Sequence, residues 1–356
     1  MNRFKKLRTS VVAIAALGLI ASACGGSDST PAAPAAPAAP SAPVVEPEPA
    51  SLAGETVTLV VGVGPGGGYD AYVRLLAPFL ADELGATVVV SNETGAGGLV
   101  ALNNLLNSPS DGTRIMLING VGIAGSALAG AEGVTFGLDE LGYVGRMYAG
   151  TKLIAAGTNS AYSSWDDVIG SSTPFVFGAS GPGASTYVEP TVLMELLGVP
   201  YTIITGYGGS ADIRAAVAAG EVDGLSLDLD SIITTINAGD AVGLVLMGSR
   251  DRDPSQPDVP TLYEFDLTPD QEASVDALTA LIEYGRTLVV HPDTPEPMME
   301  LLSDAIAKIL TSQAFIATAE AQGRPIGYAS ADEVRQQVAT ILEAPPTFRE
   351  IVKKGY

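Results

Sequence analysis

The sequence predicts an α/β fold built on mainly parallel β-sheets. Short apolar runs rich in β-branched residues alternate with segments of helical periodicity, which is typical of parallel α/β proteins. Glycine-rich loops follow three of these runs, at the position where ligands bind in open α/β sheets. The part expected to fold, residues 54–356, spans about 300 residues and is long enough for two domains.

The first block of predicted elements lies between residues 56 and 119. The pattern predicts a strand over 56–63, a helix over 70–84, a strand over 86–91, a helix over 98–106 and a strand over 114–119. Pro78 lies inside the segment 70–84, so we expect it to kink or shorten that helix.

The second block begins near Gly150. Its pattern predicts strands over 152–156, 175–177, 201–205, 222–229 and 242–247, and helices over 186–197 and 210–219. Residues 250–260 are charged and proline-rich, which indicates a linker. The pattern then resumes with a strand over 287–290 and helices over 295–311, 313–322 and 331–342.

The first 23 residues have the features of an export signal. Four basic residues precede an apolar run that is too short to span a bilayer. The residues before Cys24 resemble a bacterial lipobox, so we expect Cys24 to carry a lipid anchor; an ordinary signal peptide cut after Ala23 is the alternative. Residues 24–53 are rich in proline and alanine, as in an extended linker. We therefore expect a protein of the cell envelope, held outside the cytoplasmic membrane by lipidated Cys24.

Acidic residues outnumber basic ones by 40 to 18, which gives a formal net charge of −22. This excess argues against nucleic acid as a partner and provides no long-range attraction for an anionic ligand. A site for an anion would therefore depend on local dipoles at short range. Cys24 is the single cysteine, which excludes disulfides within the chain and cysteine-based metal clusters.

The loop Gly62-Val-Gly-Pro-Gly-Gly67 lies between the first predicted strand and helix. Backbone amides at a helix N-terminus bind anions, and glycine allows a close approach. The loop also fits the G-x-G-x-x-G pattern of dinucleotide sites, with Glu93 placed for a ribose contact. Pro65 removes an amide donor, and export separates the chain from nucleotide cofactors, so we expect no cofactor. A glycine turn with a purely structural role is the other alternative.

A comparable loop, Ser180–Thr186, precedes a helix in the second block. It offers backbone amides and hydroxyls next to the positive end of a helix dipole. A cleft between the two loops would clamp a carboxylate.

Side chains suited to catalysis or metal binding are scarce. His291 is the single histidine, and Gly178-Ala-Ser-Gly-Pro182 departs from the G-x-S-x-G pattern at its last position. One histidine, one cysteine and scattered carboxylates indicate no metal site. Asp223, Asp228 and Asp230 are close in sequence. Alternation along a strand would place Asp228 and Asp230 on one face, but a solvated strand end explains them at least as well. We expect no catalytic residue and no metal, which favours a solute receptor over an enzyme.

Several segments match, in order, the signatures of one family. They are Pro65–Asp70, Arg74–Leu80, Asn92–Gly98, Ser108–Thr113, Gly178–Ser185, Gln256–Thr261 and His291–Pro295. This ordered set resembles the periplasmic solute-binding receptors of tripartite tricarboxylate transporters, the Bug family. The resemblance implies a two-lobed periplasmic-binding-protein fold (type II-like), each lobe a mainly parallel sheet flanked by helices, with a ligand cleft between the lobes. Residues 54–148 and 249–356 would form one lobe, and residues 149–248 the other.

The resemblance also implies the residues that hold a ligand. At one end these are Pro65, Gly66, Gly67, Gly68, Tyr69, Asp70, Ala96, Gly97 and Gly98. At the other end they are Ser180, Gly181, Gly183, Ala184 and Ser185. Tyr187 and Tyr207 lie where this chain departs from the family pattern, and they either pack on the ligand or are interface tyrosines. We expect Asp70 to cap the first helix and order its loop, because a carboxylate aimed at an anion would repel it. Arg146, near the crossover between lobes, is expected to form a surface ion pair.

The family implies a receptor that captures a small organic carboxylate, either a di- or tricarboxylate or an aromatic acid, and delivers it to a transporter. The implied partners are one large and one small membrane subunit, and we expect the receptor to be a monomer. Two other classes stay open: an exported hydrolase, which turnover of esters would reveal, and a ligand sensor for a membrane signalling partner.

Overall fold

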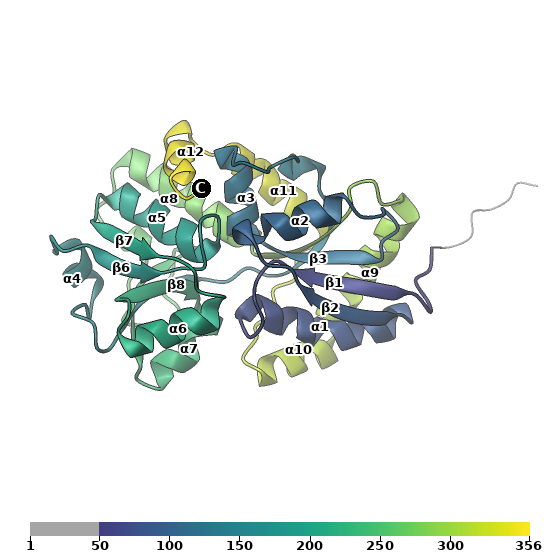
Figure 1. Ribbon diagram of the computed structural model, residues 1–356, viewed down its shortest axis with the longest axis horizontal. Coiled ribbons are helices and arrows are strands. Elements are labelled where there is room, and N and C mark those ends of the chain that lie inside the picture. The colour runs from purple at the N-terminus through teal and green to yellow at the C-terminus, as the bar shows by residue number, and fades with distance from the viewer. Residues whose placement is uncertain (1–49) are drawn as a thin grey trace, which may run out of the picture. The chain divides into compact units, whose positions relative to one another are not determined.

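Two five-stranded β-sheets form the framework of the protein (Figure 1). The computed structural model describes residues 50–356. The predictions of a signal peptide over 1–23, of lipidation at Cys24 and of most of the 24–53 linker therefore lie outside the described residues. Within the described part, no helix is both long and apolar enough to cross a membrane.

The first sheet has the strand order β2-β1-β3-β10-β4. Its strands are β1 (Thr56–Val61), β2 (Thr87–Asn92), β3 (Arg114–Asn119), β4 (Gly142–Tyr148) and β10 (Arg286–Val290). β1 is parallel to β2 and β3, whereas β10 is antiparallel to β3 and β4. Around this sheet lie α1 (Gly68–Leu84), α2 (Leu99–Leu106), α9 (Glu296–Leu310) and α10 (Gln313–Ala321). We call this sheet with these helices lobe 1.

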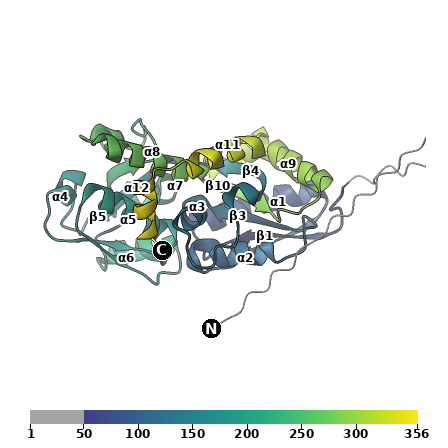
Figure 2. The same cartoon turned by 90° about the horizontal axis from the view of Figure 1, so that it is seen from above.

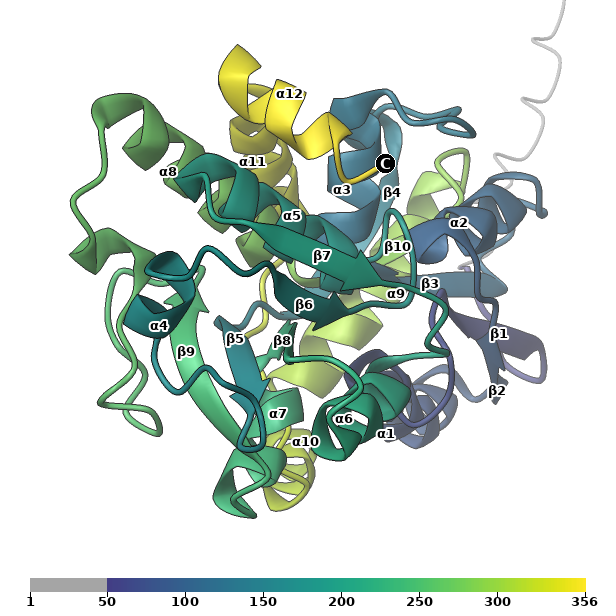
Figure 3. The ribbon, with the colours of Figure 1, turned by 60° about the vertical axis from the view of Figure 1, so that its left-hand side comes forward.

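The second sheet repeats the same pattern with the order β7-β6-β8-β5-β9 (Figure 3). Its strands are β5 (Lys152–Gly157), β6 (Phe175–Gly178), β7 (Tyr201–Ile204), β8 (Gly224–Asp228) and β9 (Ala241–Met247). β6 is parallel to β7 and β8, and β5 is the reversed strand. Helices α4 (Trp165–Ile169), α5 (Ser185–Leu197), α6 (Ser210–Ala219) and α7 (Leu229–Asn237) accompany it. We call this group lobe 2.

Four further helices join the lobes (Figure 2). They are α3 (Gly120–Ala129), α8 (Pro269–Tyr284), α11 (Ala331–Leu342) and α12 (Pro346–Lys353). α12 packs against both α3, which directly follows β3 of lobe 1, and α5 of lobe 2. One hydrophobic core consequently runs from Ile118 of β3 to Phe175 of β6. The predicted first lobe includes residues 249–356, yet α8 and α12, which belong to that range, pack beside α5 of lobe 2. The predicted lobe bounds therefore stay a prediction.

Several sequence predictions need correction. Of the two effects predicted for Pro78, the shortening is wrong, because α1 continues to Leu84; the kink stays a prediction. The strand predicted over 222–229 is β8, which ends at Asp228, and the residues that follow it form α7. The predictions missed β4 and the helices α3, α4, α7, α8 and α12. Three of the ten residues of α3 are glycine, so its local helix propensity is low; burial and a cap from Asn119, whose side chain accepts a hydrogen bond from the Gly122 N–H, stabilise it.

The packing of α12 gives a test of its role. Phe348 is fully buried in the core that both lobes share, so Phe348→Ala should lower the free energy of unfolding by about 3–5 kcal/mol. Denaturant titration measures the change. Leu342→Ala is the control, since Leu342 is 37% exposed and its truncation should cost about 1 kcal/mol or less. Equal losses in the two variants would contradict this role for α12.

Candidate functional site

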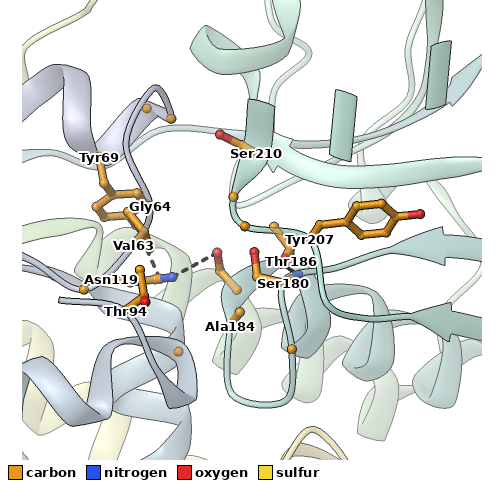
Figure 4. A pocket seen from close by; sticks show the side chains of 18 of the residues that line it. Val63, Gly64, Tyr69, Thr94, Asn119, Ser180, Ala184, Thr186, Tyr207 and Ser210 are labelled. Atoms are coloured by element: carbon orange, nitrogen blue, oxygen red, sulfur yellow. Dashed lines mark hydrogen bonds between the residues drawn. The ribbon is translucent and has the colours of Figure 1, made fainter. Parts of the chain in front are cut away.

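A cavity of about 680 Å³ lies between the two sheets. Its walls are the loops that follow β1 and β2 in lobe 1 and β6 and β7 in lobe 2 (Figure 4). Three helices begin at these walls: α1 at Gly68, α5 at Ser185 and α6 at Ser210. The first amides of a helix have no partner within the helix and lie at the positive end of its dipole. The walls are therefore rich in hydrogen-bond donors.

Eleven of the sixteen residues predicted to hold the ligand line this cavity. They are Pro65, Gly67, Gly68, Tyr69, Ala96, Gly97, Ser180, Gly181, Ala184, Ser185 and Tyr207. Gly66, Asp70, Gly98, Gly183 and Tyr187 do not line it. Contact of any of these residues with a ligand stays a prediction.

Asp70 organises the first loop from behind. Its carboxylate accepts hydrogen bonds from the Gly66 N–H and the Arg74 Nε, both at 2.9 Å, and from the Asn92 Nδ2 at 2.9 Å. Burial disfavours the charged carboxylate, but these donors outweigh burial and hold the pKa of Asp70 below its usual value. The residue that caps α1 is Gly67, not Asp70. Asp70 thus orders the loop, as expected, from the first turn of the helix.

The loop of lobe 2 is supported by the residues after α12. The Gly183 N–H donates to the Gly355 carbonyl at 3.0 Å. The Tyr356 hydroxyl donates to the carbonyl of Gly122, at the start of α3, at 2.7 Å. Gly183 therefore positions the loop, although it does not line the cavity.

The lobes touch through glycines across the cavity. A Cβ on Gly64 would lie 2.4 Å from the carbonyl oxygen of Gly208, and one on Gly97 would lie 2.0 Å from that of Gly183. Asn119 Nδ2 also donates to Ser185 Oγ at 3.1 Å, which joins β3 to α5 (Figure 4). These contacts describe a closed cleft, in which a side chain at Gly64 or Gly97 would hold the lobes apart.

The second predicted loop is locally strained. Ala96 adopts a φ of +44°, in the left-handed region that non-glycine residues rarely enter. Such strain persists where the surrounding structure enforces it, often at ligand sites. Here it brings Ala96 and Gly97 to the cavity wall.

The two tyrosines differ in placement. Tyr187 does not line the cavity. Tyr207 does, but its ring points away from lobe 1 and its hydroxyl lies 3.5 Å from Glu221 Oε2 (Figure 4). The apolar side chains of the lining come instead from Val63, Pro65 and Leu227, among others.

A buried ion network, missed by the sequence predictions, forms the floor of the cavity. Lys152 Nζ, on β5, lies 3.1 Å from Glu189 Oε1 and 2.9 Å from Asp228 Oδ1. Burial disfavours the Lys152 ammonium, but the two carboxylates outweigh it and raise the pKa of Lys152. Asp228 is 6% exposed and Asp230 also takes part in the network, so their interpretation as a solvated strand end is wrong.

Arg286 links this network to lobe 1. Its guanidinium, on β10, lies 2.9 Å from Asp228 Oδ2 and 3.2 Å from Asp230 Oδ1. Its Cζ lies 4.4 Å from the centre of the Tyr72 ring and 5.0 Å from that of Tyr69, within the range of cation–π attraction. Burial disfavours the charged Asp228 carboxylate. The cations Arg286 and, to a smaller extent, Lys152 outweigh burial and hold the pKa of Asp228 below its usual value.

Residues singled out for other roles lie elsewhere. Glu93 pairs with Arg114 and does not line the cavity, so it makes no ribose contact there. His291 Nε2 lies 3.0 Å from the Leu106 carbonyl oxygen, also outside the cavity. Arg146 donates to the Glu283 carbonyl at 2.7 Å and forms no ion pair among the described residues, contrary to expectation. Residues 50–356 contain no group of three His, Cys, Asp or Glu side chains that could hold a metal.

Two lobes that enclose a donor-lined cavity define a solute-binding protein of the periplasmic-binding-protein class. The structure is similar to that of the periplasmic binding protein BugD, with a TM-score of 0.67 at 23% identity over 84% of this chain and 97% of BugD. It is likewise similar to MatC of Rhodopseudomonas palustris with bound malate, with a TM-score of 0.67 at 22% identity over 83% and 98% of the two chains.

Sequence comparison identifies the family. Residues 72–344 match the tripartite tricarboxylate transporter family receptor (TctC), and the chain belongs to this family. A UPF0065 protein from the ttuE–ttuC' intergenic region of Agrobacterium vitis is 27% identical over 71% of each chain. Membership of this receptor family implies a location outside the cytoplasm.

The bonding of Asp70 predicts a pH-dependent effect on stability. Asp70→Asn should lower the free energy of unfolding by about 1–3 kcal/mol at neutral pH, because charged acceptors form the stronger hydrogen bonds. The pKa of Asp70 is lower in the folded protein than in the unfolded chain, where it is about 4. The ionised carboxylate therefore stabilises the folded protein above about pH 4, and this stabilisation is lost as the pH falls further. The gap between wild type and variant should therefore close below about pH 4.

Thermal melts from pH 3 to 7 check this expectation. Asp82→Asn, an exposed position on the same helix, serves as the control and should leave stability within about 0.5 kcal/mol of wild type. A gap that stays constant with pH would show that the Asp70 charge is not responsible.

Proposed function

We propose that this protein captures a small organic carboxylate outside the cytoplasm and delivers it to a transporter of the tripartite tricarboxylate type. The observation that carries the proposal is the convergence of helix N-termini from both lobes on one cavity. The partners would be one large and one small membrane subunit, and lipidated Cys24 would hold the receptor at the membrane.

The cavity suits a carboxylate for a chemical reason. Each carboxylate oxygen accepts more than one hydrogen bond, and amides at helix starts supply such donors together with partial positive charge. Gly68 and Tyr69 present the start of α1, and Ser185 and Thr186 present the start of α5. Carboxylate groups would bind at these two walls, and the carbon skeleton would lie against apolar lining such as Leu227.

Short-range dipoles also fit the acidity of the chain. With 40 acidic and 18 basic residues, the protein repels anions at long range but can bind them at contact distance. The malate held by the structurally similar MatC supports a carboxylate as the ligand class. Binding would shift the lobes from open to closed, and the closed form would dock on the transporter.

A ligand panel tests the proposed class. Dicarboxylates, tricarboxylates, aromatic acids, amino acids and sugars are added to the purified protein, and its melting temperature is measured. A bound acid at 100 times its Kd should add about 2.7 kcal/mol of stability. Stabilisation by sugars with none by carboxylates would overturn the proposal.

Closure gives a second test. Gly64→Ala should weaken carboxylate binding about 10- to 100-fold, because its Cβ would press on the Gly208 carbonyl across the cleft. Gly181→Ala is the matched control: Gly181 also lines the cavity, but its Cβ would meet nothing within 4 Å. Isothermal titration of both variants measures the difference. Equal affinities would mean that closure at Gly64 does not accompany binding.

A further inference from the structure

Two charged side chains, Lys152 and Asp228, line the cavity in the described part of the chain. Both lie on the floor, and both are buried, at 3% and 6% exposure. The other polar lining consists of hydroxyls, the Asn119 amide and backbone groups. The floor thus differs from the walls in its charged side chains, although a helix also begins there: α7, with Asp228 as its N-cap.

The charges of the floor are already matched. Lys152 has two carboxylate partners, Glu189 at 3.1 Å and Asp228 at 2.9 Å. Asp228 has two cationic partners, Lys152 and, at 2.9 Å, Arg286. Burial raises the pKa of Glu189, while Lys152 and the Ser226 hydroxyl, 2.6 Å from Glu189 Oε2, favour its ionised form. Asp230, which pairs with Arg286 at 3.2 Å and with Arg324 at 2.9 Å, belongs to the same set. With every member ionised, the set holds three cations and three anions.

This balance decides which ligand group the floor can accept. A carboxylate placed there would add a negative charge beside Asp228, and an ammonium would add a positive charge beside Lys152 and Arg286. Either leaves a buried excess charge, which is costly. A hydroxyl adds no charge, and it can donate to Asp228 while it accepts from Lys152.

Ser231 gives an independent indication of a polar ligand group. It lies in the first turn of α7, lines the same cavity and is 7% exposed, yet its Oγ has no hydrogen-bond partner among residues 50–356. The Oγ faces lobe 1, where a Cβ on Gly68 would lie only 2.4 Å away. An unsatisfied buried hydroxyl is unfavourable, and a ligand hydroxyl on the floor would supply its partner.

We propose that the floor formed by Lys152, Asp228 and Ser231 is a third subsite, which binds an uncharged hydroxyl group of the ligand. The receptor then prefers hydroxy acids to the parent acids, to the matching amino acids and to acids with an additional carboxylate. This inference rests on the proposed carboxylate function and names the ligand class within it.

Matched acids test the subsite on the unmodified protein. Isothermal titration compares propionate, lactate and alanine; succinate, malate and aspartate; and glutarate, 2-hydroxyglutarate and glutamate, with tricarballylate as the acid that carries one more carboxylate. In the series whose length fits the cavity, the hydroxy acid should bind about tenfold more tightly than the other members, the effect of one hydrogen bond to a charged group.

The outcomes separate the two proposals. Binding of parent and hydroxy acids with equal Kd would overturn the subsite and leave the carboxylate function intact. Tighter binding of the amino acid or of tricarballylate would also overturn it, since the floor would then carry an unmatched charge. No binding by any acid, in a protein that melts cooperatively, would contradict the proposed function itself.

The variant Ser231→Ala tests whether Ser231 contributes to the preference for a hydroxyl group. Ser231→Ala should reduce the preference for the hydroxy acid over its parent by about three- to tenfold, with little change in the Kd of the parent. Ser210→Ala, on the wall of lobe 2 at the start of α6, is the control and should change both Kd values alike. An unchanged preference in Ser231→Ala would remove Ser231 from the subsite.

Discussion

The ion network around Asp228 is the interaction on which the closed arrangement depends. Buried charges are tolerated only with partners, and the partners of Asp228 come from both sheets: Lys152 from β5 and Arg286 from β10. Removing either cation would leave a buried carboxylate short of compensation. Tyr72, stacked on the Arg286 guanidinium, adds contact from α1. The network therefore fixes the two lobes relative to each other at the floor of the cavity.

Because the charged groups of this network pair with one another, the groups available to bind the carboxylates of the proposed ligand are backbone amides. The walls present the first amides of α1, α5 and α6, whose dipoles are fixed by the helices and lose no side-chain entropy on binding. Such donors act at contact distance, so a net charge of −22 does not oppose the proposed binding of an anion there. In the proposed function, different atoms therefore provide attraction and selectivity. The amides of the walls bind the carboxylates of the ligand, and the side chains of the floor select the substituent on its carbon skeleton.

Local signals in the sequence were sufficient for most elements and for the glycine loops. The strand over 114–119 and the helices over 210–219 and 331–342 have the predicted bounds, because periodicity and caps are encoded by neighbouring residues. The floor was not predictable in this way. Lys152, Glu189, Asp228 and Arg286 are separated by tens of residues. Three of them are charges at the end of a strand, and Glu189 lies inside α5, so none stands out alone. α12 was missed although its local signals are present: Pro346 lies at its first position, and the buried Phe348 and Val352 are four residues apart on one face.

The apposed glycines limit what the walls can recognise. Where Gly64 meets Gly208 and Gly97 meets Gly183, backbone lies directly against backbone, so no side chain at these points can distinguish one acid from another. Amides bind carboxylates with little regard to the rest of the molecule. Discrimination must then come from the side chains that remain, and the charged ones lie together on the floor. A floor with matched charges rejects ionic substituents by desolvation and admits a group that both donates and accepts. Selectivity in this receptor thus follows from the same buried pairs that hold its lobes together.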